Sequence, residues 1–132
     1  MSKYMSFESE VFTNRELLVE ALKEMGFEDV TVGTDVLLQG WDKRDQRLAD
    51  VIIRRESVKG NRLYGDIGFQ RTVKGYSLVV DDMDLNYRLG SDFLKRLQTQ
   101  YHEATARKMA KRLGGSLVKE TIGKTVKIRV KF

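Results

Sequence analysis

Short apolar runs separated by turn residues fill the middle of this chain and limit the folds it can adopt. The runs span residues 30–32, 36–38, 49–54, 63–69 and 76–80. The segments between them contain Gly33, Gly40, Gly60-Asn61 and Gly75. Runs of this length and spacing are typical of antiparallel strands that follow one another in a meandering sheet. The many charges between the apolar positions indicate that one face of this sheet meets water.

Two segments have helical periodicity instead. Residues 14–25 repeat apolar side chains at helical spacing, with Thr13 or Asn14 as the N-cap and Gly26 as the stop. A second, long helix is predicted from Ser91 or Asp92 to about residue 113. Its apolar positions do not form a straight stripe. Either the helix bends, or its C-terminal half packs against something else.

Strands are also predicted at residues 6–11, 116–121 and 125–132. The order of elements predicts an α+β fold, and the length of 132 residues fits a single domain, residues 1–132. We expect a mostly antiparallel sheet with two helices, one long and C-terminal, on one face. The predicted core consists of the in-phase apolar positions Leu18, Leu22, Val51, Ile53, Ile67, Phe69, Leu78, Val80, Leu97, Tyr101, Ile128 and Val130.

The last predicted strand alternates strictly. Its apolar side is formed by Val126, Ile128, Val130 and Phe132, and its other side by Lys127, Arg129 and Lys131. An aromatic residue at a chain end gains stability only if it is packed. We therefore expect Phe132 to lie against the covered face of the sheet, with the three cations in solvent.

The charge is distributed unevenly along the chain. Residues 1–94 hold 13 Lys/Arg and 17 Asp/Glu, a net of −4, whereas residues 95–132 hold 11 Lys/Arg and two Glu, a net of +9. A basic C-terminal third can bind nucleic acid or another polyanion, or it can keep an edge strand soluble. The candidate nucleic-acid-binding residues are Lys95, Arg96, Arg107, Lys108, Lys111, Arg112, Lys127, Arg129 and Lys131.

The composition offers little for catalysis. The chain has no cysteine and one histidine, His102, and it has no nucleotide-binding or nucleophile motif. The acidic segment 81–84 is either a solvated turn or, in an enzyme, a site for a divalent cation. We expect a non-enzyme with no cofactor and no metal site.

The same composition bears on location. The lack of cysteine favours a reducing compartment. No stretch approaches ~18 apolar residues and no secretory signal is recognised, so we expect a cytoplasmic protein without a membrane partner. The oligomeric state stays open.

Trp41 is the chain's single tryptophan and precedes a very polar stretch. It either covers the rim of the sheet or anchors a protein partner. Together with the acidic turn it supplies the candidate protein-interaction residues Trp41, Asp81, Asp82 and Asp84.

Several segments together are similar to a known family. They are Gln39-Gly40-Trp41, residues 49–54, Asp66-Ile67-Gly68-Phe69, residues 75–81 and residues 93–101. In this order they resemble the conserved plastid and cyanobacterial family called hypothetical chloroplast frame thirty-five, a domain of unknown function. The resemblance spans nearly the whole chain and implies a cytosolic or stromal setting, but no reaction.

The chain also departs from that family. Lys3 stands where the family tends to have histidine, and Tyr101-His102-Glu103-Ala104 replaces a Tyr-Ala-Tyr-His run. A divergent copy carried by a virus of cyanobacteria, working in the host cytoplasm, would fit these departures. The leading functional hypothesis is a non-catalytic adaptor or regulatory module that binds another protein. The alternative is an RNA- or DNA-binding module that uses the basic C-terminal helix and strand.

Overall fold

A computed structural model describes residues 2–60 and 62–132 of the chain. The main body contains a five-stranded antiparallel sheet in the order β1-β5-β4-β3-β2. The strands are β1 Tyr4–Phe7, β2 Thr31–Leu37, β3 Leu48–Ile53, β4 Ile67–Arg71 and β5 Tyr76–Asp81. Strands β2 to β5 form a meander, and β1 pairs with the other side of β5. The predicted α+β fold with a mostly antiparallel sheet is confirmed.

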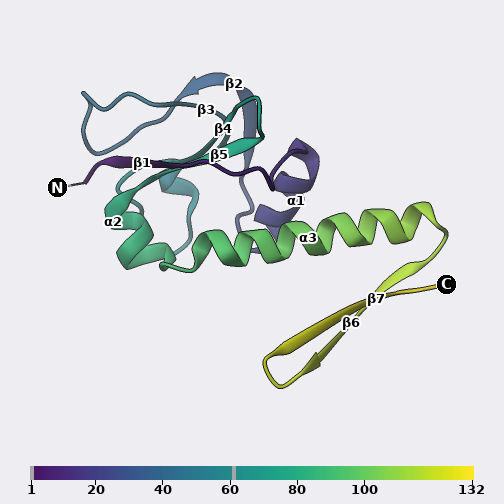
Figure 1. Cartoon of the computed structure of the whole chain (residues 1–132). Helices are drawn as coiled ribbons and strands as arrows, with labels where there is room; N and C mark the ends of the chain where they lie inside the picture. The colour runs from purple at the N-terminus through teal and green to yellow at the C-terminus, as the bar shows by residue number, and fades with distance from the viewer. Residues whose placement is uncertain (1, 61) are drawn as a thin grey trace.

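Two helices cover one face of the sheet, α1 (Arg15–Glu24) and α3 (Phe93–Arg112) (Figure 1). Asn14 caps α1, because its side-chain oxygen accepts a hydrogen bond from the Leu17 amide at 3.1 Å. Three short helical segments, η1 (Arg55–Ser57), α2 (Asp82–Asp84) and η2 (Leu85–Leu89), lie in the connections. No helix of the described residues is both long and apolar enough to cross a membrane.

The core between the helices and the sheet confirms most of the predicted positions. The buried ones are Leu18, Leu22, Val51, Ile53, Ile67, Phe69, Leu78, Val80, Leu97 and Tyr101. A smaller apolar cluster lies on the opposite face of the sheet and is formed by Tyr4, Leu38, Ala49, Ile52 and Val79. The expectation that one whole face meets water is therefore wrong for the central strands, since β5 is buried along its full length.

Four predicted strands differ from the observed ones. The first strand is Tyr4–Phe7 and not residues 6–11, and β4 begins at Ile67 because residues 63–66 form a loop. The runs 30–32 and 36–38 belong to one strand, β2, with a register shift between Val32 and Val36. Within this bulge Asp35 has φ 48°, and its amide donates to the Asp50 carboxylate at 3.0 Å.

The chain ends in a hairpin apart from the main sheet. Strands β6 (Ser116–Ile122) and β7 (Thr125–Lys131) pair only with each other among the described strands. Figure 1 shows α3 continuing beyond the sheet, with the hairpin folding back from its end. Gly123 has φ 62° at the first position of the two-residue turn, as a type II′ turn requires.

This arrangement contradicts the expected docking of the last strand. Phe132 is 79% exposed, and Ile128 and Val130, both predicted core residues, are 39% and 38% exposed. The physical reason is that β7 joins a separate two-stranded sheet beside α3, so its apolar side never reaches the main core. The predicted alternation itself is correct, and Lys127, Arg129 and Lys131 are exposed.

The hairpin contacts the C-terminal half of α3. The Gly115 amide donates to the Ala110 carbonyl at 2.8 Å, and the Lys119 ammonium lies 3.1 Å from the Glu103 carboxylate. Ala110 and Glu103 are both buried. The first of these contacts caps the C-terminus of α3 and the second joins α3 to β6. Met109 and Leu113 stay 57% and 64% exposed, so the hairpin covers only part of the C-terminal half of the helix.

Candidate functional site

Two aromatic side chains from different loops meet at one end of the sheet. Trp41, between β2 and β3, is 65% exposed, and its ring contacts that of Tyr64 edge-to-face at 5.5 Å between centroids. The Arg88 guanidinium lies 4.6 Å from the centre of the Tyr64 ring, in cation–π geometry. Met83 lines the same surface beside Trp41 and Tyr64. We call these four residues, Trp41, Tyr64, Met83 and Arg88, the aromatic platform.

A buried carboxylate holds the Tyr64 loop in place. Asp84 is fully buried and accepts hydrogen bonds from the amides of Tyr64 at 2.9 Å and Gly65 at 3.0 Å. Its Oδ1 also lies 3.5 Å from the Arg88 guanidinium. Burial raises the pKa of Asp84, and the two backbone hydrogen bonds oppose that rise. The Asp84 carboxylate therefore holds both the backbone of the Tyr64 loop and the Arg88 side chain that lies over the Tyr64 ring.

A second buried carboxylate holds the loop that carries Trp41. Asp66 accepts from the Gln39 amide at 2.8 Å and from the Arg55 amide at 2.8 Å. It also forms a 2.7 Å ion pair with Arg54. Asp66 is 0% exposed, so these donors replace the water it has lost. The result is a rigid connection between the start of the Trp41 loop and the segment after β3.

Tyr4 fills the space between the two loops. Its hydroxyl donates to the Asp66 carbonyl at 3.0 Å, and burial together with nearby carboxylates raises the pKa of Tyr4. A Cβ atom added at Gly40 would come within 2.5 Å of the Tyr4 ring, and one at Gly65 within 2.7 Å of its hydroxyl. Both loops therefore need glycine next to their aromatic residue, Trp41 after Gly40 and Tyr64 before Gly65.

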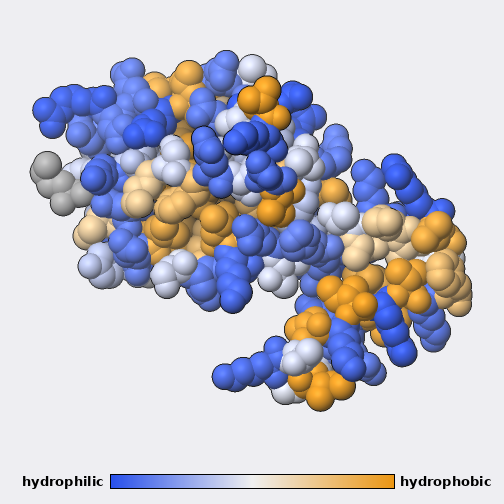
Figure 2. Space-filling model, viewed as in Figure 1, coloured by the Kyte–Doolittle hydropathy of each residue, from blue (hydrophilic) through white to orange (hydrophobic). Residues whose placement is uncertain are grey.

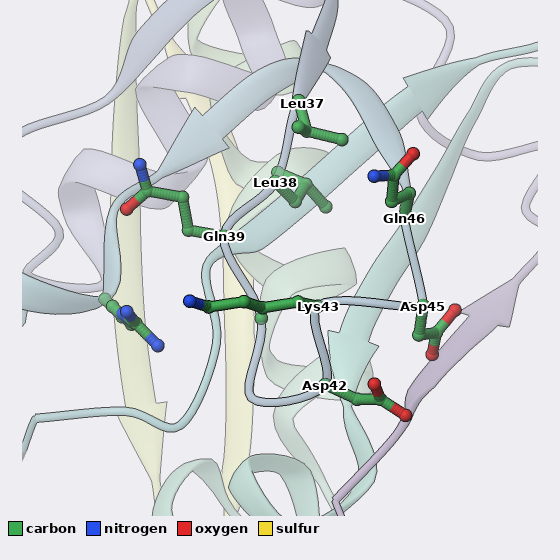
Figure 3. Close-up of a pocket in the computed structure, with 9 residues that line it drawn as sticks. Leu37, Leu38, Gln39, Asp42, Lys43, Asp45 and Gln46 are labelled. Atoms are coloured by element: carbon green, nitrogen blue, oxygen red, sulfur yellow. The ribbon is translucent and has the colours of Figure 1, made fainter.

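A pocket of about 330 Å³ lies beside this platform. It is lined by Leu37, Leu38, Gln39, Gly40, Asp42, Lys43, Asp45, Gln46 and Arg55. Figure 3 shows Lys43 extended toward the side of Gln39, whereas the carboxylates of Asp42 and Asp45 point the other way. The loop is braced by ion pairs from Arg44 to Asp42 and from Arg47 to Asp45. The pocket thus combines two leucines with two cationic side chains, two carboxylates and two side-chain amides.

The predicted acidic turn is mostly internal. Asp81 is 2% exposed and accepts from the amides of Met83 and Asp84, which makes it the N-cap of α2. Asp82 accepts from the Lys3 amide at 3.0 Å. The expectation of a solvated turn is therefore wrong for Asp81 and Asp84, because backbone amides replace water as their partners. Among the residues that the structure describes, no group of three or more His, Cys, Asp or Glu side chains could hold a metal ion.

The basic candidates do not gather on one surface. Arg96 pairs with Asp92, and Arg107 pairs with Glu20 at 2.9 Å and Glu103 at 3.4 Å. Lys108 and Lys111 lie with Arg107 beside α1. The remaining candidates on α3 are Lys95 and Arg112, and those on the hairpin are Lys127, Arg129 and Lys131. Two groups of candidates therefore share a surface: Arg107, Lys108 and Lys111 on the side of α3 that lies beside α1, and Lys127, Arg129 and Lys131 on one face of β7. His102 is exposed on α3 and contacts the Tyr101 ring edge-to-face at 6.3 Å.

Sequence reasoning identified Trp41 but missed its three neighbours on the platform. Tyr64 was assigned to a strand, and Met83 and Arg88 were not singled out. The signal in the sequence is the two pairs of an aromatic residue and a glycine, Gly40-Trp41 and Tyr64-Gly65. In both loops the glycine backbone lies close to the Tyr4 side chain, which leaves no room for a Cβ atom.

Comparison with known proteins supplies a family but no activity. No curated protein and no solved structure matches the chain. One family model does match, over residues 21–131, from within α1 to the end of β7. The matched region includes both loops of the aromatic platform as well as the hairpin. The chain therefore belongs to the family described as protein of unknown function DUF1257.

Proposed function

We propose that this chain is a non-catalytic adaptor that binds another protein through the aromatic platform. The observation that carries the proposal is a 65% exposed tryptophan on loops that buried carboxylates hold rigid. The resemblance described above supports a cyanobacterial-type cytosol or a plastid stroma as its setting.

The residue types on the platform favour protein recognition. Tryptophan, tyrosine and arginine are the residues that most often dominate the binding energy of protein interfaces. A tryptophan buries roughly 150–250 Å² when covered, so covering the exposed part of Trp41 is worth about 3 kcal/mol at ~25 cal/mol per Å². That free energy is large for one side chain, and it is gained only when a partner covers Trp41.

The rigidity of the loops adds to this potential. Ordering a flexible side chain or loop at an interface costs roughly 0.5–1.5 kcal/mol for each immobilised side chain. Tyr64 and the Trp41 loop are already ordered, because Asp84 and Asp66 accept their backbone amides. A partner would therefore bind a surface that needs little rearrangement.

The test compares three versions of the chain as bait in a lysate of the source organism. Wild type, Trp41→Ala and Tyr87→Ala are each washed at moderate salt, and the retained proteins are identified by mass spectrometry. Tyr87 is a matched control, because it is an aromatic residue that is 76% exposed but lies outside the platform. We expect a salt-resistant protein with wild type and Tyr87→Ala that is lost with Trp41→Ala.

A purified partner would then be titrated while the emission of Trp41 is recorded. Trp41 is the single tryptophan, so a blue shift on binding reports burial of this side chain alone when the partner lacks tryptophan. Absence of any protein that depends on Trp41 would refute the proposal.

The alternative function, binding of RNA or DNA by the basic C-terminal region, stays a prediction. The three cations on one face of β7 support it, and the pairing of Arg96 and Arg107 with carboxylates weakens it. If about 4–6 phosphates are contacted, the affinity should fall with a log–log salt slope of roughly −3 to −5. Flat anisotropy titrations at low salt would exclude this function.

A further inference from the structure

The hairpin is a sheet that lacks further strands. Strands β6 and β7 pair with each other and with no other strand of the described residues. An isolated two-stranded sheet is marginally stable, and a third strand or a packed helix is needed to stabilise it. Here α3 contacts the hairpin, yet all of β7 stays exposed. The free edge of β7 is therefore available to another strand.

The register assigns the two faces of the hairpin. Val126 lies opposite Thr121, Ile128 opposite Lys119 and Val130 opposite Leu117, so these residues share one side. On that side Val126, Ile128 and Val130 remain 43%, 39% and 38% exposed. Figure 2 shows hydrophobic residues gathered on this projecting part of the molecule, next to a hollow. The apolar side is thus only partly covered by α3.

The other side of β7 is cationic along its length. Lys127, Arg129 and Lys131 alternate with the apolar residues, and of the three only Lys127 faces a carboxylate, that of Glu120, across the hairpin. Neighbouring strands in a sheet place side chains of the same face about 5 Å apart, so opposite charges there attract and like charges repel. A strand added to this edge would meet three positive charges on one face and three apolar side chains on the other.

The turn also shows which backbone groups are free. In a hairpin with a two-residue turn the residues flanking the turn, Ile122 and Thr125, form a hydrogen-bonded pair, and the pairs then alternate in type. Val126, Ile128 and Val130 consequently belong to the non-hydrogen-bonded pairs. Their amide and carbonyl groups point outward from the free edge of β7.

We propose that the free edge of β7 binds an extended segment of a partner protein in which apolar and acidic residues alternate. The segment adds as a third strand, its apolar side chains extend the apolar face, and its carboxylates lie beside Lys127, Arg129 and Lys131. Pairing with β7 of a second copy is disfavoured, because it would place two rows of cations side by side. This surface is distinct from the aromatic platform, which lies at the other end of α3 (Figure 1).

The first experiment follows amide hydrogen exchange in the full chain. The probe is a capped peptide of about nine residues in which valine and glutamate alternate, and the control peptide has the same composition in scrambled order. Strand addition should slow exchange of the Val126, Ile128 and Val130 amides by at least about tenfold, because these amides point toward the added strand. Equal effects of the scrambled peptide, or protection absent from these three amides, would overturn the proposal.

The second experiment distinguishes recognition by the edge of β7 from attraction to the net positive charge of the chain. The triple variant Lys127→Glu, Arg129→Glu, Lys131→Glu should weaken binding of the valine–glutamate peptide by at least about tenfold and should bind a valine–lysine peptide instead. The matched control, Lys95→Glu, Lys108→Glu, Lys111→Glu, changes the charge equally on α3 and should bind as wild type does. Equal losses in both variants would refute recognition by β7.

Two further controls complete the test. A single-stranded oligonucleotide of the same charge that protects the same amides equally would overturn the proposal in favour of a polyanion site. Trp41→Ala should bind the peptide as wild type does, so failure at the hairpin and failure at the platform are measured independently. Circular dichroism of each variant verifies that the hairpin variants remain folded.

Discussion

The buried carboxylate Asp66 offers a sharp test of how the aromatic platform is held. In Asp66→Asn the side chain keeps its shape, but one of its two acceptor atoms becomes an amide nitrogen that can only donate. One carboxylate oxygen accepts from the Arg55 amide, and the other accepts from the Gln39 amide and the Arg54 guanidinium. Whichever way the new amide group turns, at least one backbone amide loses its acceptor.

The size of the effect follows from these contacts. Hydrogen bonds to charged groups contribute about 1.5–3 kcal/mol each, and a buried donor without a partner costs about 1–3 kcal/mol. The Arg54 side chain is 35% exposed, so solvent screens most of its lost attraction. We expect Asp66→Asn to lower the free energy of unfolding by about 2–4 kcal/mol, which corresponds to a drop in melting temperature of roughly 10 °C at this chain length.

The assay is chemical and thermal unfolding followed by the fluorescence of the single tryptophan, with near-ultraviolet circular dichroism of the native state. Asp42→Asn provides the matched control, since Asp42 pairs with the highly exposed Arg44 on the same loop, and no measurable change is expected there. A melting temperature of Asp66→Asn within about 2 °C of wild type would refute the idea that this carboxylate holds the Trp41 loop.

Three further substitutions and one deletion test other parts of the structure. Leu97→Ala should cost about 2–5 kcal/mol in denaturant unfolding, because Leu97 is fully buried, whereas Ile128→Ala should cost less than about 1 kcal/mol. Deleting residues 130–132 should lower the melting temperature by no more than about 2 °C, since Phe132 is 79% exposed, and a drop of several degrees would contradict the position of the hairpin. Burial raises the pKa of Asp84, so the folded state holds this proton more tightly than the unfolded chain does, and its contribution to stability falls as the pH rises above about 4. The melting temperature of wild type should therefore fall relative to that of Asp84→Asn as the pH is raised above about 4, and a difference that does not change with pH would contradict the assignment.

Local periodicity was enough to predict the elements that depend on short-range order. The body of α1 and an antiparallel meander follow from spacing that a reader can count along the chain. The spacing leaves the N-cap open between Thr13 and Asn14 and divides β2 into two runs. The hairpin strands were also predicted, including which side each β7 residue faces. Alternation of apolar and polar residues assigns each side chain to one face of a strand but does not show what covers that face. For this reason the sequence predicts Phe132 against the main sheet, whereas it lies exposed at the end of β7.

The candidate site depended on contacts that sequence spacing does not show. Trp41, Tyr64 and Arg88 come from three segments of the chain and meet only because Asp66 and Asp84 accept backbone amides from the intervening loops. Carboxylates in turns usually lie in solvent, so the sequence predicts a solvated turn at Asp84, whereas Asp66 falls within the predicted strand 63–69. A loop backbone without strand partners supplies the amide donors that allow these carboxylates to be buried.

An adaptor needs two surfaces that can be occupied at once, and the arrangement along α3 meets this requirement. The aromatic platform is built on the connections before α3, and the hairpin follows its last turn. The two surfaces share no residue, although the hairpin folds back along the C-terminal half of α3, where Lys119 lies 3.1 Å from Glu103. Two sites couple only when an element with two arrangements connects them, and sites far apart without shared partners act additively. We therefore expect occupation of the platform to leave the affinity of the β7 edge unchanged, so that the chain joins two partners without regulating either.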